Sequence, residues 1–381
     1  MFKTFISSFN TNNLLNVAKS LRSKYCEQVL YIQANSISRW KRSSKMTRTW
    51  ERAMGGAGKG TSGGSKVYTL LSYNILAQDL LVEHLHLYMG IEPSMLRWDH
   101  RLLRLTEEIQ HIKPDILCLQ EMQFNHIRNF VKHISFKRQL EYVFKKKTGH
   151  RTDGCAIIYD KNKFRLLADL PVEYYTKGHA ILNRDNVALL AMFSVRNEPS
   201  KKFIVATTHL LYNPKRQDVR IAQVEKLIAA LQQFSVENEN GKSVPLPVIL
   251  TGDFNFEPKT RPYQILCEQC KDPPICERFN KHDEGSGSNQ EASKEYYLKT
   301  PKGNNLQMAP IDFGMHTAST FQERWITVDY ILQSVDENRQ KIQIQSAYTL
   351  PKINDCIRTG LIPNKHLGSD HYSLGIQFSV L

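Results

Sequence analysis

The sequence predicts an α/β fold whose β-sheets are covered by helices. Helical spacing of apolar residues appears in two long segments, residues 98–112 and 218–234. Apolar segments typical of buried strands recur around them: 67–73, 115–119, 155–159, 187–195, 203–207, 247–250, 328–332 and 372–380. Strands outnumber helices and several are apolar throughout, so we expect helices to cover one face of each sheet.

The chain of 381 residues carries most of its positive charge near the N-terminus. Residues 1–65 contain eleven Lys and Arg but two Asp and Glu, and hold +9 of the formal net charge of +14. Their Gly-rich end, 55–65, is typical of a flexible linker. We therefore expect a tail and linker over 1–65, either disordered or a targeting signal, and one folded domain over 66–381. The domain is mildly basic, which suits a polyanionic substrate.

The basic tail has several interpretations. Residues 1–26 contain no acidic residue and mix apolar, Ser and basic side chains, as a mitochondrial presequence does; the alternative is an undirected basic tail. Residues 25–31 also fit the short Tyr-x4-Leu-hydrophobic pattern of ligands of a cap-binding translation factor, a pattern that recurs by chance. No apolar run approaches the roughly 18 residues of a membrane span, so we expect no membrane partner. Seven scattered cysteines favour reduced thiols and an intracellular location, cytoplasmic or nuclear if not mitochondrial.

Polar side chains stand at the ends of the expected strands. In the stretch 247–255, Gly252 ends an apolar strand, and Asp253 and Asn255 follow two positions apart, pointing the same way off an extended chain. Alone, this pattern is equally well a strand followed by an Asx turn. Six further residues occupy comparable places: Asn74, Glu121, His209, Asp329, Asp370 and His371. Eight together predict a polar site built on strand ends.

The composition of this set favours a divalent cation and phosphoryl chemistry. Carboxylate and amide oxygens suit Mg²⁺, with Mn²⁺ as the alternative, and paired cysteines typical of structural zinc are missing from the set. We expect Glu121 to be the metal ligand. Two histidines fit proton handling near neutral pH and contacts with a phosphoryl oxygen. The pattern favours in-line attack of water on phosphorus, with Asp253 activating or orienting the water.

Seven short motifs resemble, in their order, the endonuclease/exonuclease/phosphatase superfamily. They lie at Ser72–Leu76, Leu119–Met122, Asp153–Tyr159, Thr207–Pro214, Leu250–Asn255, Val328–Leu332 and Ser369–His371. Two more, Arg184–Leu190 and Pro214–Gln223, resemble the angel proteins within the nocturnin and deadenylase branch. A base-excision endonuclease of this superfamily would carry a Lys soon after Glu121, where this chain has Met122, Gln123 and Phe124.

The resemblance implies a four-layer α/β sandwich, in which two mixed β-sheets pack face to face with helices outside. It makes Glu121 a metal ligand and places Asn74 close to the metal or the phosphate. Asp370 is then either a further metal ligand or a residue that supports the ligands without touching the metal. Asp253 then acts on the water. Asn255, His209 and His371 then contact the phosphate. The Asp329 carboxylate orients His371.

The resemblance also implies a substrate with an RNA 3′ end. The enzyme is then either a 3′–5′ exoribonuclease of the deadenylase kind or an RNA 2′,3′-cyclic phosphatase. Deadenylases of this branch hold adenine between a Pro five residues after the His and an aromatic residue before the late Asp. Pro214 supplies the first half, but the second half is spaced differently, with Phe321 or Trp325 as candidates. Arg184 is a further candidate for substrate binding.

Two other function classes stay open. A phosphatase or phosphodiesterase for small nucleotides or lipids would use the same residues. A non-catalytic RNA-regulatory adaptor would use the fold and the tail to bind partners, but the complete set of site residues argues against it. The sequence carries no signal for an oligomeric state.

Overall fold

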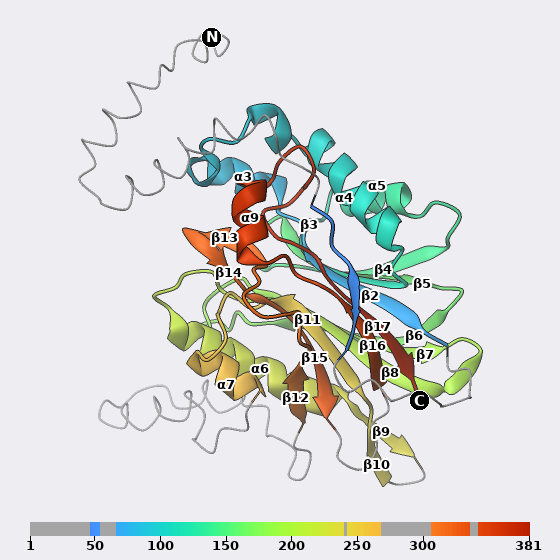
Figure 1. Ribbon diagram of the computed structural model, residues 1–381. Coiled ribbons are helices and arrows are strands. Elements are labelled where there is room, and N and C mark those ends of the chain that lie inside the picture. Colours follow the sequence, from blue (N-terminus) through green and yellow to red (C-terminus); the bar gives the residue numbers. More distant parts are fainter. Residues whose placement is uncertain (1–45, 54–65, 240–241, 268–305, 336–341) are drawn as a thin grey trace, which may run out of the picture.

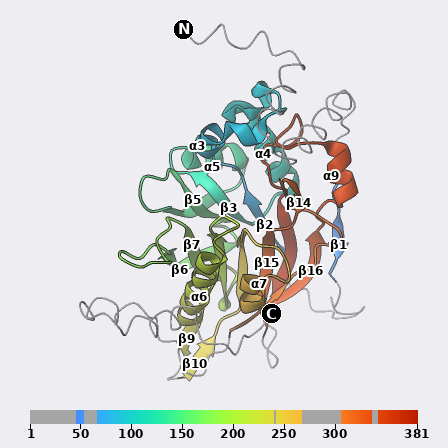
Figure 2. The ribbon, with the colours of Figure 1, turned by 90° about the vertical axis from the view of Figure 1, so that its left-hand side faces the viewer.

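The computed structural model describes residues 46–53, 66–239, 242–267, 306–335 and 342–381 (Figure 1). Two mixed sheets pack face to face. Helices α4 and α5 lie on one side of the pair, and α6 and α7 lie on the other, as two perpendicular views show (Figures 1 and 2). The predicted four-layer α/β sandwich is confirmed.

The first sheet has the strand order β1-β16-β17-β2-β3-β5-β4. Its outer face is covered by α4 (Trp98–Ile112) and α5 (Ile127–Ile134). The strands are β1 (Trp50–Arg52), β2 (Tyr68–Asn74), β3 (Ile116–Gln123), β4 (Leu140–Lys146), β5 (Asp153–Asp160), β16 (Ile342–Tyr348) and β17 (Leu374–Val380). A short helix, α3 (Gln78–Glu83), and 3-10 turns at Leu85–Tyr88 and Pro93–Leu96 connect β2 to α4.

The second sheet has the order β12-β15-β11-β8-β7-β6. Its outer face is covered by α6 (Gln217–Phe234) and α7 (Arg261–Cys267). The strands are β6 (Phe164–Glu173), β7 (Val187–Val195), β8 (Glu198–His209), β11 (Val248–Asp253), β12 (Gln307–Pro310) and β15 (Asp329–Val335). Outside both sheets lie the hairpins β9 (Val236–Glu239) with β10 (Lys242–Pro245) and β13 (Thr320–Gln322) with β14 (Arg324–Ile326), and helix α9 (Ile353–Thr359).

The central strands carry continuous apolar runs because both of their faces are buried. In β2, Leu70 faces the core between the sheets, while Leu71 faces the helices that cover the first sheet. In β7, Leu189 and Leu190 divide in the same way on the second sheet. Burying such a side chain contributes about 1.5–3 kcal/mol, so these uninterrupted apolar runs fix the two sheets as the middle layers.

Residues ahead of the predicted domain start at Lys66 also join the first sheet. β1 pairs antiparallel with β16, and the Trp50 ring lies 5.3 Å from that of Tyr348. The Arg48 guanidinium donates to the Thr349 carbonyl (2.8 Å). The segment has no apolar periodicity because it is held by backbone pairing at a sheet edge. The division expected at residue 65 therefore does not coincide with the start of the sheet.

Several sequence-based expectations fall outside the described residues. These are the presequence over 1–26, the cap-binding pattern over 25–31 and the whole Gly-rich linker over 55–65. Within the described ranges, none of the helices has the length and apolar character needed to cross a membrane.

Candidate active site

Strands of both sheets deliver polar side chains to one edge of the sandwich. In the first sheet, β2 ends at Asn74, and parallel β3 carries Glu121 near its end. In the second sheet, parallel β8 and β11 end at His209 and Asp253, which are paired in register. β15 runs antiparallel to β11 and begins with Asp329 opposite Asp253. Because the carboxyl ends of parallel strands meet at one edge, residues far apart in sequence converge.

Asp253 lies at the centre of this group and is 2% exposed. Its Oδ2 accepts a hydrogen bond from Asn74 Nδ2 (2.9 Å) and lies 3.7 Å from Nε2 of both His209 and His371. Burial, and then the nearby charge of Asp329, raise the pKa of Asp253 to about 7. A carboxylate with such a pKa suits proton transfer from water at neutral pH.

Neighbouring residues fix the backbone around Asp253. A Cβ on Gly252 would lie 2.2 Å from the carbonyl oxygen of Thr208, so only glycine allows β8 and β11 to approach here. The Asn255 backbone N–H donates to Asp253 Oδ1, and its side-chain amide donates to the Leu210 carbonyl, both at 3.0 Å. Asn255 therefore positions Asp253, and its contact with the phosphate stays a prediction.

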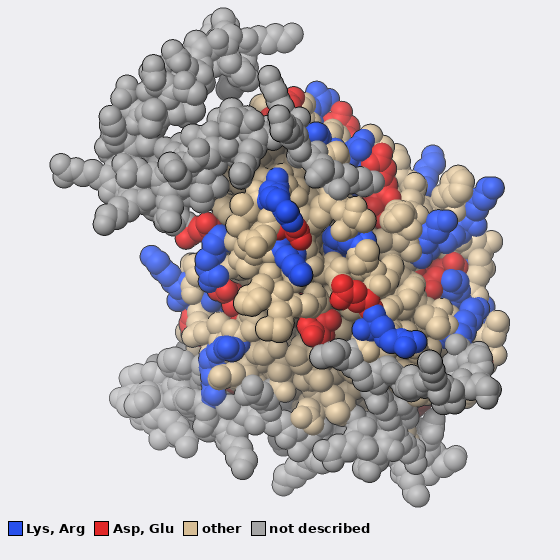
Figure 3. Space-filling view, viewed as in Figure 1, with Lys and Arg blue, Asp and Glu red and all other residues tan. Residues whose placement is uncertain are grey.

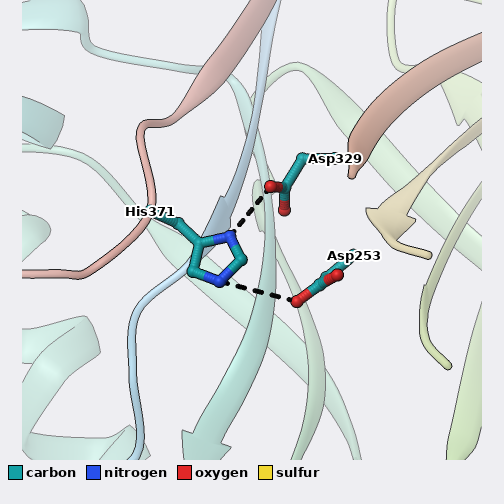
Figure 4. A group of neighbouring side chains, drawn as sticks. All are labelled: Asp253, Asp329 and His371. Carbon is teal, nitrogen blue, oxygen red and sulfur yellow. Dashed lines mark hydrogen bonds and ion pairs between the residues drawn. The ribbon is translucent and has the colours of Figure 1, made fainter. Parts of the chain in front are cut away.

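His371 lies between two carboxylates (Figure 4). Its Nδ1 is 2.8 Å from Asp329 Oδ2, and its Nε2 faces Asp253. Burial alone would lower the pKa of His371, but the charges of Asp329 and Asp253 outweigh that effect and raise the pKa well above its usual range. The ring is therefore an imidazolium at neutral pH. The orientation of His371 by Asp329 is the arrangement that the resemblance implies.

His209 has the opposite protonation state. Its ring is buried between Glu121 Oε1, 3.9 Å from Nδ1, and Asp253 Oδ2, 3.7 Å from Nε2. Burial, and then the positive charges of Lys147 and His371, lower the pKa of His209 well below its usual range, so the ring is neutral. Its buried Nδ1 has no hydrogen-bond partner among the described residues. Two histidines with separated pKa values provide different proton-transfer roles within one site.

Glu121 occupies a bulge in β3, where the pairing with β5 shifts between Leu119 and Met122. Its φ of 58° is unusual for a residue with a side chain, and such backbone conformations concentrate at functional sites. The carboxylate accepts hydrogen bonds from Ala77 N–H (2.9 Å) and from Asn74 Nδ2 (3.1 Å). The bulge turns this side chain towards Asp253, which a regular strand would not do.

The charge balance around Glu121 favours a cation. Burial raises the pKa of Glu121; the positive charge of Lys147 opposes this, and the carboxylates of Asp153 and Asp370 reinforce it. Lys147 itself is buried and pairs with Asp153 (2.7 Å). Glu121 and Asp370 thus offer oxygen atoms in a region with excess negative charge, which suits a metal ion.

Two sets of residues could hold a metal. Asp253, Asp329 and His371 place ligand atoms within 4.8 Å of one another, but the bond between Asp329 and His371 already occupies one atom of each. Glu121 and Asp370, which the sequence predicts, are the more accessible pair, and the Asp370 carboxylate is fixed by the Tyr88 hydroxyl (2.8 Å). We favour this second set because it leaves the buried pair intact.

Asn74 lies beside Glu121 and Asp253, and its place close to the metal or the phosphate stays a prediction. Its amide nitrogen bridges Glu121 and Asp253, while its Oδ1 accepts a hydrogen bond from Leu76 N–H (3.0 Å). In this arrangement the Asn74 amide nitrogen joins the two candidate carboxylates.

The candidate substrate residues are only partly placed as expected. Pro214 is exposed on the loop after β8. In the β13–β14 hairpin, Trp325 lies edge-on to Phe321 (5.2 Å between ring centres) and also packs on Tyr372 at 6.1 Å. Trp325 is therefore built into the core margin rather than standing as a separate stacking surface. The Arg184 guanidinium donates to the backbone and side chain of Asn183, not to a site carboxylate.

Sequence reasoning missed the buried groups that position the site. Arg101 on α4, Lys147 at the end of β4 and Arg220 on α6 are all less than 9% exposed. Ser369 Oγ donates to the Asn74 carbonyl (2.6 Å), which joins the segment before His371 to the end of β2. Basic residues are usually on the surface, so their residue types gave no signal for these positions.

Comparisons with known proteins agree with this architecture. Residues 71–371 match the model of the Endonuclease/Exonuclease/phosphatase family. The chain is 46% identical over 319 residues to protein angel of Drosophila melanogaster, a match that covers 82% of this chain and 81% of that protein. It is 38% identical over 205 residues to human protein angel homolog 1, covering 52% of this chain but 30% of that protein.

Solved structures show the same likeness. ANGEL2, a 2′,3′-cyclic phosphatase, in complex with adenosine-2′,3′-vanadate, matches with a TM-score of 0.69 and 26% identity over 88% of this chain and 99% of that chain. The human nocturnin catalytic domain matches with a TM-score of 0.57 and 21% identity, over 90% of this chain and 99% of that domain, a likeness in fold. The chain therefore belongs to the endonuclease/exonuclease/phosphatase family of phosphoester hydrolases, as its motifs predict.

Proposed function

We propose that this chain is a Mg²⁺-dependent phosphohydrolase that removes 2′,3′-cyclic phosphates from RNA 3′ ends. The observation that carries the proposal is the buried Asp253 carboxylate, whose Oδ2 lies 3.7 Å from Nε2 of both His371 and His209. This arrangement supplies a base for water and a fixed positive charge for a phosphoryl oxygen within one small space.

The residues divide the reaction between them. Asp253 accepts a proton from the attacking water, and Asn74 and Asn255 keep its two oxygens in place. The His371 imidazolium, held by Asp329, donates to an oxygen on phosphorus as negative charge grows there. One water opens the cyclic ester: its oxygen bonds to phosphorus, a P–O bond to the ribose breaks, and the departing ribose oxygen takes up the proton that Asp253 accepted. A second water releases inorganic phosphate and leaves both ribose hydroxyls free.

Glu121 and Asp370 are the residues we assign to Mg²⁺, with Mn²⁺ as the alternative. The bound ion supplies further stabilisation of negative charge on the phosphoryl oxygens. Oxygen donors and the excess of negative charge around Glu121 support a hard divalent cation.

Two observations favour the cyclic phosphatase over a deadenylase. Trp325 packs against Tyr372 and Phe321, so the second half of the adenine clamp expected of deadenylases does not stand free. The 26% identity to ANGEL2, a cyclic phosphatase, extends over 88% of this chain. On the face shown in Figure 3, basic and acidic residues are interspersed.

The test uses the full chain, Mg²⁺ and one short 5′-labelled RNA with either an A-rich 3′-hydroxyl end or a 2′,3′-cyclic phosphate end. Loss of the terminal phosphate alone, on the second substrate, supports the proposal. A descending ladder on the first substrate identifies a 3′–5′ exoribonuclease instead. No reaction on either RNA, with Mg²⁺ bound, refutes both and shifts the assignment to small nucleotides or lipids.

Three variants separate the assigned roles. Asp253→Asn should bind Mg²⁺ in calorimetry as the wild type does but lose turnover, because the proton acceptor is gone. Glu121→Gln should lose Mg²⁺ affinity. Asp169→Asn, an exposed change on β6, is the matched control and should leave both properties unchanged. Wild-type rates for both Asp253→Asn and Glu121→Gln would mean that the residues are assigned wrongly.

The N-terminal signals remain part of the proposal. We expect residues 1–26 to direct the chain to mitochondria, or else to act as an undirected tail, and residues 25–31 to offer a weak site for a cap-binding translation factor. Fractionation of cells that express the full chain or residues 46–381 tests the first point. Capture by the purified cap-binding factor tests the second.

A further inference from the structure

A buried arginine on α6 holds the loop that leaves the site after β8. Arg220 is 6% exposed, and its guanidinium donates to four successive carbonyls: Leu211 (3.2 Å), Tyr212 (3.3 Å), Asn213 (2.7 Å) and Pro214 (3.2 Å). A planar group with several fixed donors suits this task, whereas a lysine ammonium does not. The guanidinium thus fixes a backbone that has no helical or strand hydrogen bonds of its own.

A second buried side chain on α6 fixes the start of the same loop. Gln223, fully buried, accepts a hydrogen bond from Leu211 N–H (3.0 Å) and donates to Asn186 Oδ1 (3.2 Å). Asn186 in turn donates to the His209 carbonyl (3.0 Å). Burying polar groups is costly unless they are bonded, so their position on the inner face of a helix indicates a specific task.

The loop is also tied to the catalytic strand. Leu210 N–H donates to the Asp253 carbonyl (3.0 Å), and the Leu210 carbonyl accepts from the Asn255 side chain (3.0 Å). The next residues therefore leave directly from the site. Among them, Leu211 packs inward against a small apolar cluster, whereas Tyr212 is 52% exposed.

Tyr212 stands on the fixed loop that leaves the site after β8 and His209. Partial burial, and then the charges of Asp370 and Asp253, raise the pKa of its phenol group, which agrees with its place three residues after His209. An exposed aromatic ring on a fixed backbone can stack on a nucleobase with little loss of conformational freedom. Such stacking accepts every base because each base has a π-face.

We propose that Tyr212 binds the base of the 3′-terminal nucleotide and that Arg220 is its positioning residue. The inference rests on the proposed function, since it needs a terminal nucleotide whose phosphate lies at Asp253. It adds a reason for the enzyme to prefer RNA ends over small phosphoesters and to accept ends of any sequence. Tyr212 supplies the stacking surface that Trp325, packed on Tyr372, does not offer.

The test compares two RNAs that both end in a 2′,3′-cyclic phosphate, one with a terminal base and one with an abasic terminal ribose. Wild type should prefer the base. Tyr212→Ala should lower kcat/KM for the base-bearing RNA by roughly 5- to 150-fold, mainly through KM, and leave the abasic RNA unchanged. Tyr212→Phe should keep the preference. Phe136→Ala removes a 72% exposed aromatic ring between α5 and β4 and is the control, without effect on either RNA.

The role of Arg220 is tested by the preference between the two RNAs, a ratio that a general loss of stability would not change. Arg220→Lys keeps the positive charge but loses the planar set of N–H donors. It should reduce the ratio of kcat/KM for the base-bearing RNA to kcat/KM for the abasic RNA. Arg138→Lys is the matched control, because that guanidinium holds the Pro114 carbonyl (2.6 Å) at the other end of the first sheet. If Arg220 acts through Tyr212, the double variant should lose no more preference than Tyr212→Ala alone.

The outcomes separate the two proposals. An inactive wild type refutes the proposed function. A wild type that is active but treats both RNAs alike, or a Tyr212→Ala variant that loses the same factor on both, overturns the inference about Tyr212 and leaves the function standing. Additive losses in the double variant overturn the role of Arg220.

Discussion

Replacing Arg101 by methionine would show whether one buried guanidinium joins two loops of the active site. Arg101 is fully buried. It donates to the carbonyls of Ile75 (3.0 Å) and Leu76 (2.8 Å), which follow β2, and to the carbonyl of Gly368 (3.0 Å), three residues before His371. The β2 loop and the segment that leads to His371 belong to different parts of the sequence, and Arg101 contacts both.

The expected cost follows from these contacts. Methionine keeps much of the buried volume but leaves three buried carbonyls and the half-buried Gln78 Oε1 without their donor, at about 1–3 kcal/mol for each buried unsatisfied group. Removing a buried charge recovers part of this, because desolvating a guanidinium is itself unfavourable. We therefore expect the free energy of unfolding to fall by about 3 kcal/mol.

Urea unfolding measures this loss, and calorimetry at low temperature measures Mg²⁺ affinity of the folded variant. Affinity should fall too, because Asp370 lies two residues after Gly368, and the β2 loop holds the Glu121 carboxylate through the Ala77 N–H. Arg104→Met on the same helix removes a surface pair with Glu107 (2.8 Å) and should change stability by less than about 0.5 kcal/mol. If Arg101→Met matched that control, the carbonyls would not depend on Arg101 and our reasoning would be refuted. If it did not fold, Arg101→Lys would give the milder test.

Two further predictions concern pH and the N-terminal strand. Activity that needs a charged His371 is lost as the pH rises through the pKa of His371, and the Asp329 carboxylate raises that pKa. Asp329→Asn should therefore move the basic limb of the pH–kcat profile to lower pH. An unmoved limb would rule out this role for His371. Deleting residues 1–65 should lower the thermal midpoint more than deleting 1–45, because only the longer deletion removes β1 and the Arg48 contacts; equal midpoints would show that β1 adds no stability.

Several candidate site residues can be located from the sequence because they follow an apolar strand, whereas Asp329 begins one. At Asp253, the change from apolar residues to Gly252 and then to a carboxylate is visible in nine residues. The same logic finds Asn74 and His209, and parallel pairing then brings the strand ends together. The bulge at Glu121 is not visible in the same way, since it depends on how β3 pairs with β5.

The elements that the sequence misses have weak apolar patterns. β6 alternates between exposed and buried residues at a sheet edge, and β1 is held by backbone pairing, so neither contains a continuous apolar run. The contact between the two aromatic rings of the β13–β14 hairpin is missed for another reason. Its two rings meet because β13 and β14 pair Phe321 with Trp325, and spacing along the chain does not reveal such a pair.

Buried charge explains both what the site can bind and why part of it escapes sequence analysis. Carboxylates from both sheets meet in one buried region, and burial together with mutual repulsion raises the pKa of Asp253 and of Glu121. The opposing positive charges, Lys147 and His371, are each already paired with an aspartate. The remaining negative charge therefore favours a divalent cation. The cation binds where carboxylates lack a basic partner, so the pairing of the basic residues matters more than their number.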